Sequence, residues 1–197
     1  RAKALAEART RRGEVIEQIK GDEAVVVLDD AETVRWRAEP WANPVAFELV
    51  KSDQYGQKGE SLLKVALQGG EKDKWAISFP LSGDVSNRDH VTLDFVVVKG
   101  RPQVALAVKT NPGWRWYESP ARRLRPRVVR NLSFGLKTKN FKANETKWRH
   151  TTEIKNPDAL AQLLLVIYGQ AGTEFMIDNV RMIKGPAPPE ETAPLPE

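Results

Sequence analysis

The alternation of apolar and polar residues between positions 24 and 184 predicts a protein built from β-strands. In the segment 90–100, Val91, Leu93 and Phe95 alternate with Thr92 and Asp94, so one face is apolar and the other polar. Short runs of this kind recur along the chain, separated by Gly, Asp, Asn and Ser residues typical of turns. The nine runs are 24–30, 45–51, 61–67, 74–81, 90–100, 102–110, 130–138, 162–169 and 174–184.

The order of these runs predicts an antiparallel architecture. No helical segment alternates with the strands, so a parallel sheet built from βαβ units is excluded. The run Leu163–Ile167 is apolar on both faces and is expected at the centre of a sheet or beneath an N-terminal helix. We predict an all-β fold, a sandwich of two antiparallel sheets with a short N-terminal helix.

The two ends of the chain differ from the strand-rich segment 23–184. Residues 1–22 are charged and rich in helix formers, and their apolar residues have a loosely helical spacing. Gly13 is a poor helix former, so the segment is predicted to form either one short helix or two helical pieces. We interpret them as a connector docked on the main domain; a partner-binding helix is the alternative. Residues 185–197 contain five prolines and three glutamates, which predicts a stiff linker or disordered tail of a modular parent protein. The apolar helix positions are Leu5, Ala8, Val15, Ile16 and Ile19.

Composition narrows the class of protein further. A chain of 197 residues suits one domain, and no apolar run approaches the roughly 18 residues needed to span a bilayer. The net charge of +5 comes from 31 basic and 26 acidic residues spread along the chain, which is weak support for nucleic-acid binding. Cysteine is absent, so disulfides, thiolate metal sites and cysteine nucleophiles are excluded. The chain begins at Arg1 without a signal-like segment, which indicates a fragment of something longer.

Several motifs together resemble a known family. The segments are "VVLDDAETVRW" at 26–36, "KWAISFPL" at 74–81, "HVTLDFVVV" at 90–98, "RNLSFGL" at 130–136 and "FMIDNVRM" at 175–182. Over residues 24–184 their order resembles the jelly-roll carbohydrate-binding modules of the galactose-binding-like superfold. The resemblance implies a jelly-roll β-sandwich and a carbohydrate ligand, without defining which sugar.

The segment 111–127, "NPGWRWYESPARRLRPR", is the main candidate for a binding site. Flat aromatic rings stack on the C–H faces of sugars, while nearby polar groups bind their hydroxyls. If the segment is extended, Trp114 and Trp116 point one way and Arg115 and Tyr117 the other. The alternative is that these rings close one end of the core. The candidate ligand-binding residues are Trp114, Trp116, Tyr117, Arg115, Trp41, Tyr55 and Lys109, whereas Trp36, Trp75 and Trp148 are expected in the core.

The same segment is rich in arginine. Guanidinium groups match sulfate, phosphate and uronate groups, but a run of charges is usually a solvated face. No helical, finger or RNA-binding signature accompanies them, so an acidic polysaccharide is favoured over nucleic acid as a ligand. The series is Arg115, Arg122, Arg123, Arg125, Arg127 and Arg130.

A structural calcium is a second candidate site. The resemblance implies a calcium that links the start of the domain to its end, where Asp30, Glu32 and Asp178 are the candidate ligands beside Asp29. Calcium takes carboxylate and carbonyl oxygens from separate segments. The alternative is that these acids pair with Arg181, Lys64 or backbone amides.

Signatures of catalysis are missing from the sequence. His90 and His150 lie at strand boundaries without metal-ligand spacing, and there is no nucleophile elbow, P-loop or dinucleotide fingerprint. We predict a non-catalytic module that binds a poly- or oligosaccharide within a larger extracellular, periplasmic or cell-surface protein. The alternative is a structural or interaction domain that docks a neighbouring domain or subunit through residues 1–20.

Overall fold

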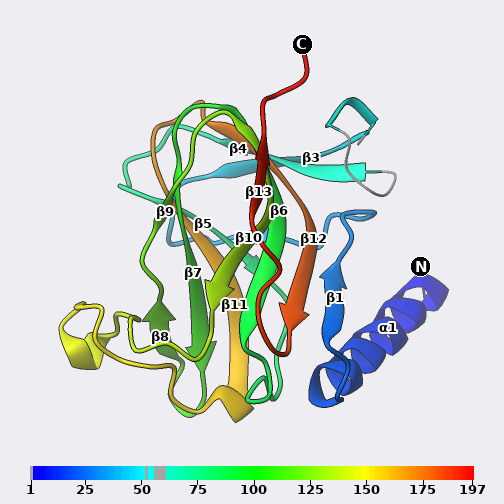
Figure 1. Ribbon diagram of the computed structural model, residues 1–197, viewed down its shortest axis with the longest axis vertical. Helices are drawn as coiled ribbons and strands as arrows, with labels where there is room; N and C mark the ends of the chain where they lie inside the picture. The colour runs from blue at the N-terminus through cyan, green and yellow to red at the C-terminus, as the bar shows by residue number, and fades with distance from the viewer. Residues whose placement is uncertain (1, 52, 56–60) are drawn as a thin grey trace.

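The protein is a sandwich of two antiparallel sheets with one helix beside it (Figure 1). A computed structural model describes residues 2–51, 53–55 and 61–197. Each of the nine predicted runs forms a strand, which confirms the predicted fold class. Within the described residues, no helix is long and apolar enough to cross a membrane.

Sheet A contains the strands that come from both ends of the chain. Its order is β13-β10-β6-β12-β4-β3, and β1 pairs with β12. The first and last predicted strands are therefore neighbours. The strands are β1 (Val25–Asp29), β3 (Val45–Lys51), β4 (Ser61–Leu67), β6 (His90–Lys99), β10 (Arg127–Gly135), β12 (Glu174–Ile183) and β13 (Glu191–Ala193).

Sheet B is formed by strands from the middle of the chain. Its order is β2-β5-β11-β7-β8, and β9 pairs with β7 beyond the end of β8. The doubly apolar strand β11 lies at the centre of the sheet, as predicted, because both of its faces are covered. The strands are β2 (Arg37–Ala38), β5 (Trp75–Phe79), β7 (Gln103–Thr110), β8 (Arg115–Glu118), β9 (Arg122–Arg123) and β11 (Leu160–Tyr168).

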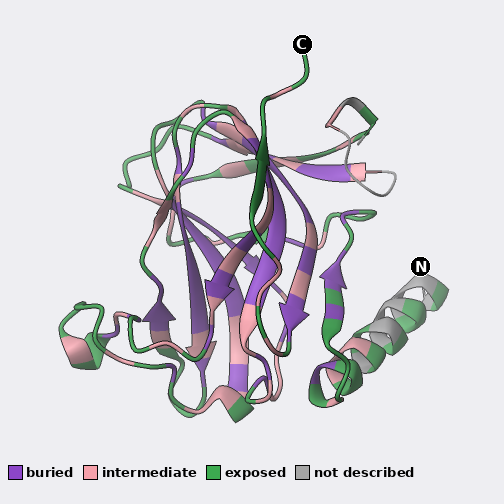
Figure 2. Cartoon of the chain, viewed as in Figure 1, coloured by how far each residue is buried: buried purple, intermediate pink, exposed green. Residues whose placement is uncertain are grey.

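The main core lies between the two sheets, and Figure 2 shows buried residues along their central strands. The alternating apolar residues of β6 are buried there, as predicted, and so are those of β7. Phe95 and Phe175 stack at a ring-centroid distance of 4.6 Å. Trp36 and Trp75 are buried in this core, which confirms the role predicted for them.

Helix α1 (Ala2–Lys20) is one continuous helix that passes through Gly13. It reaches the core through Ile19, which is buried, and Val15, which packs beside it. The buried Arg88 donates hydrogen bonds to the carbonyl oxygens of Ile19 and Gln18 at 2.9 and 2.7 Å. These carbonyls at the end of a helix have no partner within the helix, so Arg88 fastens α1 to the sandwich. The side chains of Leu5 and Ala8 are not among the described ones, so the apolar contacts expected of them stay a prediction.

The proline-rich tail returns to the sandwich. A linker or disordered tail is predicted for 185–197, but Glu191–Ala193 pairs with β10 as strand β13. Leu195 also packs on an apolar cluster that includes Val128 and Val96 on the outer face of sheet A. The prolines lie outside the paired residues, so strand pairing is compatible with the composition.

Candidate functional site

The outer face of sheet B has an apolar floor. In β7 the small side chains of Ala105 and Ala107 face outward, opposite the inward residues of the core. Together with Leu164 and Val166 of β11 they form a buried cluster, against which the half-buried Trp116 packs. Alanines rise little above the sheet, so there is room for larger side chains to form walls around this floor.

A cleft of about 500 Å³ opens on this face. Two of its tryptophans, Trp41 and Trp116, meet edge to face, with ring centroids 5.5 Å apart and an interplanar angle of 81°. Glu39 holds the first of these rings, because its carboxylate accepts hydrogen bonds from Trp41 Nε1 at 2.7 Å and from Gln162 Nε2 at 2.8 Å. The cleft is lined by Trp41, Lys74, Lys109, Trp116, Glu118, Lys142 and Trp148.

The hairpin between β7 and β8 adds a further tryptophan at the rim. Trp114 lies in its turn with φ of 51° and is 60% exposed. Trp114, Trp116 and Trp148 also line an adjoining cavity of about 570 Å³. Lys109 Nζ lies 5.7 Å from the Trp114 ring and 5.6 Å from the Trp116 ring, within the range of cation–π attraction. The lysine thus stabilises the position of both rings.

A polar group of residues forms one side of the cleft. The buried carboxylate of Glu118 pairs with Lys142 Nζ at 3.1 Å and accepts hydrogen bonds from Trp116 Nε1 at 3.2 Å and from the Tyr168 hydroxyl. Burial, together with this hydrogen bond to Glu118, raises the pKa of Tyr168 above its ordinary value. The phenol therefore stays neutral and keeps donating its proton to the carboxylate.

The structure brings together most of the predicted ligand-binding residues. Trp41, Lys109 and Trp116 line the cleft, and Trp114 and Arg115 line the adjoining cavity. The geometry predicted for the segment is partly wrong, because Trp114 lies in a turn with positive φ rather than in an extended strand.

Two predicted residues do not present their rings to the cleft. Tyr117 borders the adjoining cavity, but it faces inward in β8 and is fully buried, so its ring is not available to a ligand. Tyr55 follows β3 in a 3-10 helix (Asp53–Tyr55) and packs on the outer face of sheet A beside Leu62 and Met176. It therefore lies on the other sheet from the cleft.

Sequence reasoning missed several cleft residues. Trp148 was predicted in the core, but it is 53% exposed with φ of 61°, next to a 3-10 helix at Asn144–Thr146. No run of alternating residues surrounds it, and this was the available signal that it does not belong to a strand. The remaining missed residues, Lys74, Glu118 and Lys142, converge only through strand pairing, as in the bridge between Glu118 and Lys142.

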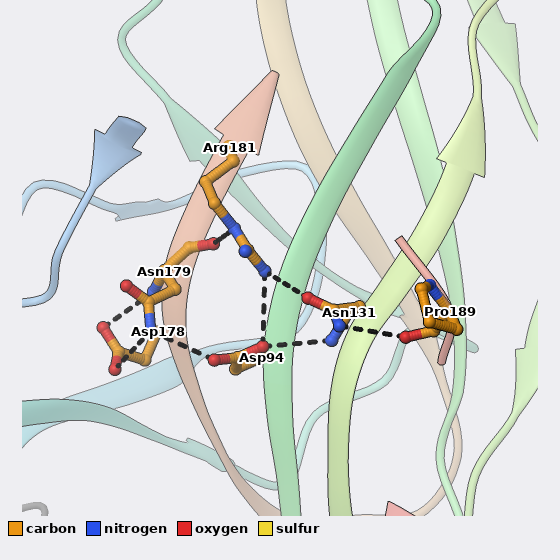
Figure 3. A network of polar contacts seen from close by, with 6 residues as sticks. All are labelled: Asp94, Asn131, Asp178, Asn179, Arg181 and Pro189. Carbon is orange, nitrogen blue, oxygen red and sulfur yellow. Dashed lines mark hydrogen bonds and ion pairs between the residues drawn. The ribbon is translucent and has the colours of Figure 1, made fainter. Parts of the chain in front are cut away.

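Asp178, one of the acidic residues predicted to bind calcium, belongs to a polar network on sheet A (Figure 3). Asp94 accepts hydrogen bonds from Asn179 Nδ2 at 3.0 Å and from Arg181 Nη2 at 3.4 Å, so Arg181 pairs with Asp94 rather than with the predicted ligands. Asp178 accepts a hydrogen bond from the backbone N–H of Asn179 at 2.7 Å. Burial raises the pKa of Asp178 to about 7, and the carboxylates of Asp94, Asp29 and Asp30 contribute to this rise.

These observations only partly fit a cation. Across residues 2–51, 53–55 and 61–197, no three His, Cys, Asp or Glu side chains are grouped closely enough to bind a metal ion. Glu32 instead accepts a hydrogen bond from the backbone of Ser61 at 3.3 Å. However, one oxygen of the buried Asp29 has no hydrogen-bond partner among the described residues. One oxygen of Asp29 thus lacks a donor and the pKa of Asp178 is raised, while calcium binding there stays a prediction.

Solved structures with a similar fold include carbohydrate-binding modules. No protein-family model and no curated protein matches the chain. A family 11 carbohydrate-binding module of a cellulosomal cellulase from Clostridium thermocellum is similar with a TM-score of 0.61 and 15% identity, covering 84% of this chain and 97% of that one. A xylan-binding CBM22 domain from Paenibacillus barcinonensis has a TM-score of 0.50 and 13% identity, covering 85% of this chain and 100% of that one.

One similar structure is part of an enzyme. An exo-β-agarase matches with a TM-score of 0.59 and 11% identity, covering 81% of this chain but 25% of the agarase chain. At these identities the likeness establishes the fold and not the ligand. The chain therefore has the jelly-roll sandwich fold of these carbohydrate-binding modules, as its sequence motifs predicted.

Proposed function

We propose that this protein is a non-catalytic carbohydrate-binding module whose ligand lies in the cleft on sheet B. The observation that carries the proposal is the group of tryptophans around one groove: Trp41, Trp116 and Trp148, with Trp114 at its rim. Exposed large apolar rings are costly to leave in water, and their gathering around a groove is typical of a binding site.

The cleft offers both surfaces that a sugar needs. The indole rings provide flat apolar faces for the C–H side of a pyranose ring. Lys74 and Lys142 provide donors, and Glu118 provides an acceptor, for hydroxyl groups at the same groove. Glu118 and Lys142 are fixed in advance by their ion pair, so these two side chains lose little entropy on binding.

Backbone conformation at two of the tryptophans supports the same site. Trp114 and Trp148 adopt φ values of 51° and 61°, a region that residues other than glycine rarely occupy. Such conformations cost on the order of 1 kcal/mol each and concentrate at functional sites. Here they turn two exposed rings toward one cavity.

Alanine substitution of single tryptophans tests the proposal. We expect Trp116→Ala and Trp148→Ala each to weaken polysaccharide binding by about 1 to 3 kcal/mol, because a few aromatic residues dominate such interfaces. Binding is measured by isothermal titration against soluble mixed-linkage glucan, xylan and agarose oligosaccharides, with insoluble polysaccharides in pull-downs. The melting temperature should shift little for Trp148→Ala, because the Trp148 ring is 53% exposed.

Leu49→Ala is the matched control, because Leu49 is 39% exposed on β3, away from the cleft. It should leave binding unchanged. The proposal is wrong if no polysaccharide in the panel binds, or if the tryptophan variants bind as tightly as Leu49→Ala.

The setting of the module also belongs to this proposal. We propose that it is an accessory part of a longer exported or cell-surface protein, because a similar domain makes up 25% of an agarase chain. As a non-catalytic module it should bind oligosaccharides without cleaving them, which chromatography of the recovered sugars after long incubation will check. Docking of a neighbouring domain through residues 1–20 stays a prediction.

A further inference from the structure

A second groove, of about 640 Å³, lies at the opposite end of β7 from the tryptophan cleft. Residues from both sheets and from the tail contribute to its walls. Five of these residues are arginines, and we call it the arginine groove. It is lined by Arg101, Gln103, Arg122, Arg123, Leu124, Arg125, Arg127, Val129, Glu190 and Thr192.

The positive charge of the arginine groove is largely uncompensated. Among the described residues, its one ion pair joins Arg122 to Glu190. The side chains of the other four arginines take part in no hydrogen bond or ion pair with the described residues, and three of them are exposed. Like charges in one groove repel one another, so this arrangement opposes folding unless an anion reduces the repulsion. The four are Arg101, Arg123, Arg125 and Arg127.

The chain itself shows that a carboxylate fits in the arginine groove. Glu190 lies just before β13, and its Oε2 accepts from Arg122 Nη2 at 2.8 Å. This distance is typical of a charge-assisted hydrogen bond. One carboxylate therefore occupies one of five guanidinium groups, and the remaining groups are free to bind further anionic groups.

The arginine groove and the tryptophan cleft are linked by one strand. Gln103 and Lys109 face outward at the two ends of β7, on the same side as Ala105 and Ala107. Six residues of extended strand span about 20 Å. Arg123 pairs directly with Gln103, as Trp116 pairs with Lys109. A linear ligand that lies in the cleft and runs along β7 therefore reaches the arginine groove.

We propose that the arginine groove is a second binding site, for the carboxylate or sulfate groups of an anionic polysaccharide. Guanidinium groups bind both kinds of oxyanion with two parallel hydrogen bonds. The groove contains no aromatic side chain on which a nucleobase would stack, which argues against single-stranded nucleic acid. The site goes beyond the tryptophan cleft and is tested separately from it.

The test compares binding of polygalacturonate and dextran sulfate by the full chain and its variants at low salt. For the triple variant Arg101→Gln, Arg123→Gln and Arg125→Gln we expect about a tenfold loss of affinity for the polyanion that wild type binds, and a weaker dependence on salt. The matched control lowers the net charge by the same amount at three exposed lysines outside the groove. Its substitutions are Lys3→Gln, Lys51→Gln and Lys139→Gln. It should lose no more than about twofold.

Two neighbouring glutamates provide a test by gain of affinity. Glu190 lines the groove, whereas Glu191 does not. Glu190→Gln frees Arg122 and should raise affinity for the polyanion about threefold, while Glu191→Gln makes the same charge change and should raise it less. This pair keeps the test informative if the triple variant does not fold.

Three results would overturn the proposal. The first is failure of wild type to bind either polyanion, and the second is an equal loss of affinity in the arginine and lysine variants. The third is displacement of the bound polyanion by a 20-base-pair DNA duplex at a total DNA charge lower than that of the polyanion. The last would assign the groove to nucleic acid. Binding of neutral polysaccharides by Trp116→Ala is measured in parallel, so failure of one site is distinguished from failure of the other.

Discussion

Trp116 and Tyr117 are adjacent in β8 and have opposite environments. Trp116 faces the cleft and is half-buried, whereas Tyr117 faces the core and is fully buried. The hydroxyl of Tyr117 has no hydrogen-bond partner among the described residues. A buried hydroxyl without a partner keeps its desolvation cost, so its role is to fill volume rather than to bind.

We therefore expect Tyr117→Phe to be neutral or to raise the free energy of unfolding by up to about 1 kcal/mol. Tyr117→Ala should lower it by about 3 to 5 kcal/mol, because it leaves a large cavity. Urea denaturation measures both. Loss of stability in Tyr117→Phe would show that the hydroxyl has a partner, and normal stability in Tyr117→Ala would place the ring outside the core.

Asp178 makes stability depend on pH. Burial, with the carboxylates of Asp94 and Asp29 adding to it, raises its pKa from 3.8 to about 7. Between these two values the folded state holds a proton that the unfolded state has lost, so stability falls as the pH rises from about 4 to about 7. Asp178→Asn should flatten this dependence and raise the melting temperature at pH 8, measured in the presence of a chelator.

Calcium provides the control for this prediction. If Asp29 and Asp178 bind the ion, adding calcium in place of the chelator raises the melting temperature at pH 8, and the rise is smaller at pH 5.5 because Asp178 is then protonated. Asp178→Asn should reduce that rise. An unchanged melting temperature in calcium would show that this protein does not bind the ion. A stability that increases between pH 4 and 7 would contradict the raised pKa of Asp178.

At the scale of elements, the end of α1 depends on one buried arginine. Arg88 is fully buried and donates to the carbonyl oxygens of Gln18, Ile19 and Gly21 at 2.7, 2.9 and 3.1 Å, and also to Glu23. A cation at the C-terminus of a helix is also favoured by the helix dipole. Ile19 and Val15 make the apolar contact of the helix with the core, and Asn87 Nδ2 also donates to the carbonyl oxygen of Lys20 at 3.2 Å.

Arg88→Ala should lower the free energy of unfolding by about 3 kcal/mol, because several carbonyl groups lose a charged donor in a buried place. Arg88→Lys is the control, and it should recover part of the loss, since one ammonium group cannot reach all four carbonyls. Chemical denaturation followed by far-ultraviolet circular dichroism measures both. Equal stability of wild type and Arg88→Ala would show that α1 is not fastened by this residue.

At the scale of the whole molecule, the tail connects the two sheets. Strand β13 pairs with β10 of sheet A, while Glu190 binds Arg122 on β9 of sheet B. Asn131 Nδ2 also donates to Pro189 O at 2.9 Å (Figure 3). The tail therefore belongs to the folded unit along part of its length.

Removal of residues 186–197 should lower the free energy of unfolding by about 1 to 3 kcal/mol, because strand pairing and the packing of Leu195 are lost. Glu190→Gln alone should change it by less than about 0.5 kcal/mol, since the ion pair is partly exposed. Urea midpoints measure both. If the truncated protein is as stable as the full chain, the tail is a linker that does not stabilise the fold.

Much of the fold was predictable because strands with one buried face have a strict period of two. All nine predicted runs form strands, and the residues predicted to share the apolar face of β6 lie in the core. The short strands β2, β8, β9 and β13 were missed, because two to four residues are too few to show a period. The left-handed turn at Trp114 was missed for a similar reason, since no pattern encodes φ at a single residue other than glycine.

The sequence alone determined the class of the fold, the identity of its core strands and the presence of an unusual tryptophan- and arginine-rich segment, because these depend on local alternation and composition. Only the tertiary structure decided which rings are available: Trp148 joins the cleft, Tyr117 fills the core, and Tyr55 lies on the other sheet. It also decided that the tail carboxylate lies among arginines. These outcomes depend on which strands pair and with what register, and that is fixed by contacts between residues far apart in the chain.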